Sequence, residues 1–239
     1  MQGLASPLAF PLALIGAYLI GSLSFAVIFS RLMGLADPRS YGSKNPGATN
    51  VLRSGNKAAA ILTLVFDALK GYVPVLLVLI FGKPYGLGED AAAFVGLAAF
   101  IGHLWPVFFR FQGGKGVATA AGVLMGVNPL LGLCTLVSFA IIVAFSRYVS
   151  LASIVEAAFA PFYQALIWGV EPALLALAAM SLLLIWRHEG NIKKLLAGKE
   201  SKLGQKAAPP GPLQQVDKPH AHHAHAKHHK DHHKSKGHH

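Results

Sequence analysis

The sequence is short of charge and of cysteine. Only 13% of its 239 residues are charged, whereas 54% are hydrophobic. Because soluble domains carry about 25% charged residues, this composition excludes an ordinary soluble core. Cys134 is the single cysteine, which excludes a disulfide framework and a cysteine-based metal site. No lysine or arginine precedes Arg31, and the first apolar run exceeds a signal-peptide core, so we expect that run to be retained.

Apolar runs of membrane-spanning length recur instead. Seven candidate spans are 7–30, 58–81, 91–109, 117–126, 129–145, 151–168 and 172–186. The fourth is shorter than the roughly 20 residues that a bilayer needs, so it is either a half-helix or fused to the fifth across Asn128-Pro129. The fold class is therefore all-α, an integral membrane bundle of about seven transmembrane helices.

Basic residues decide between these two arrangements. Seven spans place nearly all of them on one face: Arg31, Arg39, Lys44, Arg53, Lys57, Arg110, Lys115, Arg147, Arg187, Lys193 and Lys194. Six spans would divide them between both faces, which the positive-inside rule disfavours. We therefore predict an outside N-terminus and a cytoplasmic C-terminus. Since the net charge of +11 reflects loops and tail, it does not imply a nucleic-acid partner.

The C-terminal segment differs in composition from the rest. Residues 201–239 are rich in Lys, Pro, Gln and His, with ten of the twelve histidines between His220 and His239. We predict a disordered cytoplasmic tail there, beside a membrane-embedded domain over 1–200. The favoured interpretation is a solvated tail that takes no part in chemistry. Binding of metal ions and an expression tag are the alternatives.

Three polar segments share the predicted cytoplasmic face. In the first, YGSKNPGATNVLR at 41–53, Asn45 is a good N-cap and Pro46 suits the first helical position, so a helix is predicted to start there. Its open N–H groups suit a phosphate, and Arg53 adds a fork of donors. An ordinary capped loop is the alternative.

The other two segments carry a lysine and a histidine. GGKGVATAAG at 113–122 offers flexible backbone donors and the Lys115 ammonium, although it is not a P-loop and also fits a snorkelling turn. RHEGNIKKLLAGKE at 187–200 predicts an interfacial amphipathic helix with His188 and Asn191 on one face. Each signal is weak alone, but their convergence on one face favours a site for anions.

A few ionisable residues fall inside the spans. Asp67 and Lys70 stand three apart, and Glu156 stands alone. Because charges at membrane depth are costly, we expect them to face the bundle interior, with Asp67 and Lys70 paired. His103 and Trp105, in GHLWP, belong to the interface belt or approach the site.

In order, these motifs resemble the bacterial acyl-phosphate-dependent glycerol-3-phosphate acyltransferases. The resemblance is carried by GS-x-S-F-A at 21–26, D-x-R at 37–39, GSKNPGATNVLR at 42–53, DALKG at 67–71, GHLWPVFFRFQGGKGVAT at 102–119, RYVSLASI at 147–154 and RHEGNIKKLLAGKE at 187–200. It runs from about Gly21 to Glu200 and leaves out the His-rich tail. The family lacks the His-x-x-x-x-Asp signature of other glycerophosphate acyltransferases, and neither His103 nor His188 has an Asp five residues later.

The resemblance implies a seven-span enzyme of the bacterial inner membrane with its active site at the cytoplasmic face. It would move an acyl group from acyl phosphate to the 1-hydroxyl of sn-glycerol 3-phosphate, with no cofactor or metal, giving lysophosphatidic acid and phosphate. Membrane lipids are the other expected partners. The residues expected to be catalytic are Arg53, Lys115, His188 and Asn191. Those expected to bind phosphate are Ser43, Asn45, Gly47, Thr49, Asn50, Gly113, Gly114, Ser150 and Ser153.

Some alternatives stay open at this stage. Direct transfer is preferred because no protein nucleophile is evident, and either His188 or a substrate phosphate oxygen is the base. A transporter of a small phosphorylated anion would use the embedded Asp67, Lys70 and Glu156, but no internal repeat is found. A non-catalytic membrane scaffold with a metal-binding tail is the third reading.

Overall fold

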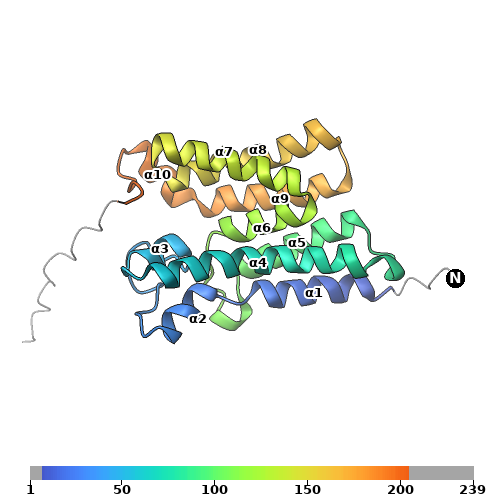
Figure 1. Cartoon of the computed structure of the whole chain (residues 1–239), viewed down its shortest axis with the longest axis horizontal. Coiled ribbons are helices and arrows are strands. Elements are labelled where there is room, and N and C mark those ends of the chain that lie inside the picture. Colours follow the sequence, from blue (N-terminus) through green and yellow to red (C-terminus); the bar gives the residue numbers. More distant parts are fainter. Residues whose placement is uncertain (1–6, 205–239) are drawn as a thin grey trace, which may run out of the picture. The chain divides into compact units, whose positions relative to one another are not determined.

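The computed structural model describes residues 7–204, and within them the chain is helical without strands (Figure 1). The helices are α1 (Ala9–Gly21), α2 (Phe25–Leu32), α3 (Ala48–Leu52), α4 (Lys57–Phe81), α5 (Glu89–Leu104), α6 (Val117–Val127), α7 (Pro129–Ser146), α8 (Val149–Trp168), α9 (Pro172–Arg187) and α10 (Glu189–Leu196). Two 3-10 turns, η1 (Lys83–Tyr85) and η2 (Val107–Phe109), complete the elements. The predicted all-α class is confirmed.

Within residues 7–204, five segments are long and apolar enough to cross a membrane: Ala9–Leu32, Lys57–Phe81, Glu89–Phe109, Pro129–Ser146 and Val149–Trp168. The pair α9 and α10, bent by 56°, makes a sixth if it counts as one span. Helix α6 has 11 residues and is therefore about 16 Å long, well short of a hydrocarbon core of about 30 Å. Each of the seven predicted spans falls on apolar helical structure, but neither α6 nor α9 alone qualifies by length.

The first predicted span is interrupted. Helix α1 ends at Gly21 and α2 starts at Phe25, so the predicted span 7–30 contains two helices within the apolar segment Ala9–Leu32. The break frees backbone carbonyls, and the Lys70 Nζ atom donates to the Leu23 carbonyl oxygen over 2.7 Å. Lys70 Nζ also lies 2.7 Å from Asp67 Oδ1, with both side chains buried. The predicted Asp67–Lys70 pair is confirmed, and it also holds the α1–α2 break.

Helices α6 and α7 form a tight hairpin instead of one fused helix. Asn128 caps α7, because its Oδ1 accepts from the Leu130 N–H at 2.9 Å. Across the hairpin, a Cβ added to Gly132 would meet the Met125 backbone. Small residues also let α4 and α6 approach each other, since a Cβ at Gly122 would collide with the Ala68 carbonyl. Of the two alternatives for the fourth span, the structure therefore has the separate helix.

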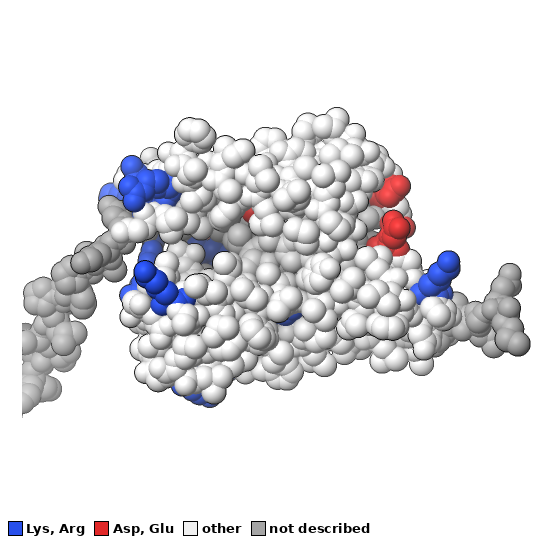
Figure 2. Space-filling model, in the orientation of Figure 1, with Lys and Arg blue, Asp and Glu red and all other residues white. Residues whose placement is uncertain are grey.

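Charged side chains gather at the two ends of the bundle (Figure 2). Most lysines and arginines lie at the end that carries α2, α3 and α10, while the acidic side chains of the opposite end lie near the starts of α5 and α9. Between the ends, the core consists of apolar side chains such as Phe100, Leu124 and Leu177, each at most 2% exposed. The loops that carry the polar motifs therefore meet at the basic end.

Candidate functional site

A cavity of about 770 Å³ lies between the polar loops of the basic end. Figure 2 shows a hollow in the face of the molecule between the layer with α7 and the layer with α4, with basic side chains near its mouth. Of the thirteen residues predicted for the site, eleven line this cavity, and Gly113 and Gly114 do not. They come from four separate stretches: 43–53, 115, 150–153 and 188–191.

The loop before α3 differs from the prediction in where its helix begins. Helix α3 starts at Ala48 with Gly47 as its N-cap, in extended backbone. The Gly47 N–H donates to the Asn45 carbonyl oxygen at 2.9 Å, so Asn45 and Pro46 form a turn before the helix. The predicted start at Asn45–Pro46 was wrong because this local turn occupies the position where the first helical turn was expected. Five residues also make too short a helix to present a strong dipole.

Asn50 closes this loop from within. Its Nδ2 donates to the carbonyl oxygens of Pro38 at 2.7 Å and Tyr41 at 3.2 Å, and its Oδ1 accepts from the Ser43 N–H at 3.0 Å. Both amide hydrogens are thus used inside the loop. Gly42 has a φ of +58°, and a Cβ there would collide with the Asn50 side chain. Asn50 therefore shapes the loop that lines the cavity.

Arg53 stands at the mouth of the cavity. This residue directly follows α3, and its side chain is exposed. Its Nη2 atom donates a hydrogen bond to Ser201 Oγ at 3.0 Å. Ser201 belongs to residues 200–204, all of which line the cavity. The sequence did not single out this segment, although Glu200 ends the last motif. An arginine with one neutral partner keeps further N–H donors for an anion.

A hydrogen-bonded chain crosses the cavity from Lys115 to Ser150. Lys115 Nζ donates to Asn191 Oδ1, and Asn191 Nδ2 donates to Glu200 Oε1 at 2.7 Å. Ser150 Oγ donates to the same carboxylate oxygen at 2.9 Å. Burial lowers the pKa of the Lys115 ammonium to about 8, and nearby positive side chains add to this, whereas the Glu200 carboxylate opposes it. Three predicted site residues therefore meet around one carboxylate that the sequence reasoning missed.

His188 lies at the junction of α9 and α10, where it is 2% exposed. Its Nδ1 lies 2.8 Å from the Leu184 carbonyl oxygen. Since a carbonyl only accepts, Nδ1 carries the proton and Nε2 is left as an acceptor. Burial lowers the pKa of His188 to about 4, so the ring is neutral at pH 7. His188 is thus a neutral hydrogen-bonding group in the cavity wall.

Gly113 and Gly114 hold the Lys115 loop in place but do not line the cavity. Arg187 donates to both carbonyl oxygens, with Nη2 at 3.0 Å from each. A Cβ at Gly113 would collide with the His103 and Leu104 carbonyls, and one at Gly114 with the His103 ring. The glycines are therefore required by close packing, and Arg187 fixes the loop. Sequence reasoning counted Arg187 only as a basic residue.

Part of the membrane-embedded polar cluster reaches the cavity. His103 Nδ1 lies 3.2 Å from Thr119 Oγ1 and 3.7 Å from Asp67 Oδ1. Both His103 and Asp67 line the cavity. The prediction that the GHLWP segment approaches the site is confirmed for His103.

The deeper wall of the cavity is apolar. Its side chains come from α4, α6 and α7 and include Leu64, Ala121, Leu136 and Phe139. Leu64 and Leu136 are also exposed at the protein surface, where lipid surrounds such helices. One continuous space therefore joins a cationic mouth to an apolar branch between α4 and α7. Such a space suits an amphiphile with an anionic head.

The chain is also similar in sequence to known proteins. The profile of the family described as glycerol-3-phosphate acyltransferase matches residues 11–198. The chain is 62% identical over 205 residues to the glycerol-3-phosphate acyltransferase of Albidiferax ferrireducens, covering 83% of this chain and 91% of that protein. It is 62% identical over 192 residues to that of Janthinobacterium sp. (strain Marseille), covering 80% and 96%.

Two solved structures resemble the fold. Both are crystal structures of PlsY (YgiH), an integral membrane glycerol 3-phosphate acyltransferase. The glycerol 3-phosphate form has a TM-score of 0.76 at 38% identity, covering 82% of this chain and 96% of that one. The lysophosphatidic acid form has a TM-score of 0.74 at 38% identity, covering 82% and 95%. With its apolar helices and its cavity of cationic and apolar parts, the chain belongs to the family of glycerol-3-phosphate acyltransferases, which are integral membrane proteins.

Proposed function

We propose that this protein transfers a fatty acyl group from acyl phosphate to the 1-hydroxyl of sn-glycerol 3-phosphate, giving lysophosphatidic acid and phosphate. The observation that carries the proposal is the single cavity of about 770 Å³ with a cationic mouth and an apolar branch. Forms of PlsY with glycerol 3-phosphate and with lysophosphatidic acid support the acceptor and the product.

The two phosphates bind at the cationic mouth. Arg53 and the 43–49 loop hold one of them, and Lys115 holds the other. Asn191 accepts a hydrogen bond from Lys115 and so fixes the position of its ammonium group. Ser150 and Ser153 lie on the side of α8 that lines the cavity. The acyl chain lies in the apolar branch, beside Leu136 and Phe139.

Transfer is direct, with no acyl-enzyme. The 1-hydroxyl oxygen attacks the acyl carbonyl carbon, and the bond between that carbon and the phosphate oxygen breaks as phosphate leaves. Lys115 stabilises the negative charge that develops on the departing phosphate. The hydroxyl proton passes to a phosphate oxygen, because phosphate, with a second pKa of about 6, is a stronger base than His188, with a pKa of about 4. His188 Nε2 orients glycerol 3-phosphate by accepting a hydrogen bond from its 2-hydroxyl, which leaves the 1-hydroxyl proton free to pass to the phosphate oxygen.

The protein crosses the bacterial inner membrane seven times, with its N-terminus outside and its active site and C-terminus on the cytoplasmic side. The concentration of basic residues at the cavity end of the bundle supports this orientation (Figure 2). Helix α6 packs against α4, α5 and α7, so neighbouring helices surround it where its short length would otherwise face lipid.

The C-terminal prediction concerns mostly residues outside the described part of the chain. Of the proposed tail over 201–239, only 201–204 are described, and these four line the cavity. The metal ions predicted for the tail histidines concern residues 220–239, which lie outside the described residues. Within 7–204, no group of three or more His, Cys, Asp or Glu side chains is placed to hold a metal ion.

The proposal is tested with the purified protein in lipid nanodiscs, given acyl phosphate and glycerol 3-phosphate. We expect lysophosphatidic acid and inorganic phosphate to form in equal amounts, and omission of either substrate to stop the formation of lysophosphatidic acid. Glycerol 3-phosphate counterflow in proteoliposomes without lipid product would contradict the proposal and indicate transport. An acyl group trapped covalently on the protein would contradict direct transfer.

A further inference from the structure

Glu156 is a carboxyl group buried among the apolar helices. It lies in the middle of α8 and is 4% exposed. Among residues 7–204 it has no hydrogen-bond or ion-pair partner, and this distinguishes it from the paired Asp67 and Lys70. A polar group buried at membrane depth without a partner is costly, so its position calls for a ligand.

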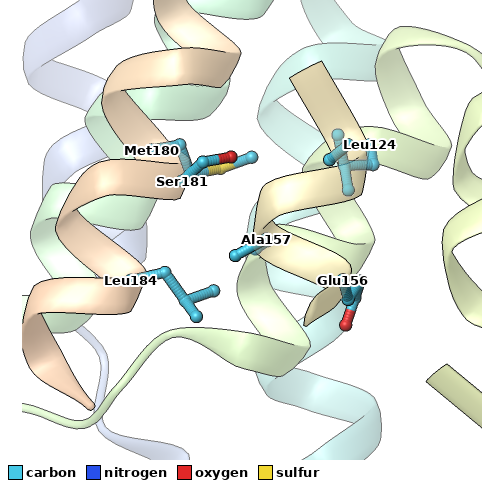
Figure 3. Close-up of a pocket in the computed structure, with 8 residues that line it drawn as sticks. Leu124, Glu156, Ala157, Met180, Ser181 and Leu184 are labelled. Atoms are coloured by element: carbon cyan, nitrogen blue, oxygen red, sulfur yellow. The ribbon is translucent and has the colours of Figure 1, made fainter. Parts of the chain in front are cut away.

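The neighbouring helices do not supply that partner. On one side Glu156 borders a small cavity of about 10 Å³ between α6, α8 and α9, too small for an organic ligand. Figure 3 shows Met180 and Ser181 projecting from α9 into this region, while the carboxyl oxygen of Glu156 points away from them. Its partner must therefore come from the other side.

On its other side Glu156 lines the large cavity of the active site. Ser150, Ser153 and Glu156 follow one another at intervals of three residues in α8, and all three line that cavity. Six residues of helix place Glu156 about 9 Å deeper along the axis than Ser150. The two serines already have partners, since Ser150 donates to Glu200 and Ser153 donates to the Val149 carbonyl at 2.9 Å. Of the three polar groups, only Glu156, the deepest, makes no hydrogen bond within the described residues.

We propose that Glu156 forms a polar subsite in the acyl branch of the cavity, which takes a fatty acyl chain that bears a hydroxyl group near its middle. This inference rests on the proposed function, because it assumes that the acyl chain enters this branch. A hydroxyl at that depth donates to the carboxyl group and gives it the partner it lacks. A plain methylene chain covers the carboxyl group and leaves it unsatisfied, which is the situation in which binding sites discriminate most strongly.

The test compares acyl phosphates of one chain length. One donor is unsubstituted, and the others carry a single hydroxyl near the phosphate, near the middle or near the methyl end. The quantity measured is the ratio of kcat/KM for each hydroxylated donor to kcat/KM for the plain donor. For the wild type we expect the largest ratio with the mid-chain hydroxyl, by about fivefold to tenfold over the other two positions, the effect of one buried hydrogen bond.

Two variants and one control separate this role from general stability. Glu156→Leu should remove the preference for the mid-chain hydroxyl and raise kcat/KM for the plain donor, whereas Glu156→Gln keeps a hydrogen-bonding group and should retain the preference. Gln164 is the matched control, because it is buried in the same helix but does not line the cavity. Gln164→Leu should leave the ratios unchanged.

The outcomes distinguish this proposal from the one on which it rests. Lysophosphatidic acid formation from none of the donors would overturn the proposed function. Normal turnover of the plain donor without any mid-chain preference in the wild type would overturn the subsite alone. A preference that persists in Glu156→Leu would likewise exclude Glu156 as its source. The wild-type scan decides the question even if Glu156→Leu does not fold.

Discussion

The lowered pKa of Lys115 should be visible in the pH dependence of catalysis. Lys115 holds phosphate only while its ammonium is protonated, and kcat/KM reports the ionisation of the free enzyme. With a pKa of about 8, the protonated fraction falls from about 0.9 at pH 7 to about 0.1 at pH 9. We therefore expect kcat/KM for acyl phosphate, the substrate whose phosphate Lys115 holds, to fall about tenfold over this range. A lysine with an ordinary pKa of about 10.4 would stay protonated throughout.

The origin of this loss is tested by substitution. The substrate phosphates do not cause it, because phosphate ionisation near pH 6 is already complete. Lys115→Arg carries a guanidinium that does not deprotonate, so its profile should stay flat from pH 7 to about pH 9 even if its overall rate is lower. Lys193→Arg is the matched control, since Lys193 is an exposed lysine on α10 that pairs with Glu189. Initial rates are measured with the stability of acyl phosphate checked at each pH.

Two results would refute the reasoning. One is a wild-type profile that stays flat to about pH 9, which would mean that burial does not lower the pKa of Lys115 as described. The other is a falling limb that persists in Lys115→Arg, which would assign the titration to another group.

Two further predictions concern Arg53 and the embedded ion pair. Arg53→Ala should lower kcat/KM by about a hundredfold or more while thermal stability stays unchanged, because its guanidinium is exposed at the cavity mouth. Arg31→Ala in α2 is the control. Wild-type turnover in Arg53→Ala would contradict the assignment. Asp67→Leu should lower the free energy of unfolding by about 3–5 kcal/mol, because it leaves buried Lys70 unpaired. Adding Lys70→Met should recover part of this loss but not all of it, because the Leu23 carbonyl then has no donor. Thermal unfolding in detergent measures both changes, and a double variant no more stable than Asp67→Leu would contradict the prediction.

Several features of the fold followed from the sequence because they depend on local chemistry. Helix positions came from apolar runs, since a bilayer requires each crossing segment to satisfy its own backbone hydrogen bonds. The Asp67–Lys70 pair came from a spacing of three, which places two side chains on one face of any helix. The junction at Asn128-Pro129 was ambiguous because capping and continuation use the same residues there, and the cap at 2.9 Å decided it.

Other features were mispredicted or missed. The helix expected at Asn45 begins at Ala48, because Gly47 is in extended backbone and its N–H bonds to Asn45. The hydrogen bonds of both Asn50 amide hydrogens within its loop were not predicted. Arg187 and Glu200 were not singled out at all. A charged residue after a membrane helix is common, and nothing in its type indicates which distant group it will meet.

The sequence by itself determined which segments are apolar helices and that the basic loops gather at one end of the bundle, because hydropathy and charge act on each residue separately. Tertiary structure alone decided that Lys115, Asn191, Glu200 and Ser150 form one chain of contacts, and that Glu156 lines the same cavity without a partner. These groups are far apart along the chain, and their distances depend on how closely α4, α6, α8 and α9 pack. That packing is set by many small contacts at once, which no single stretch of sequence encodes.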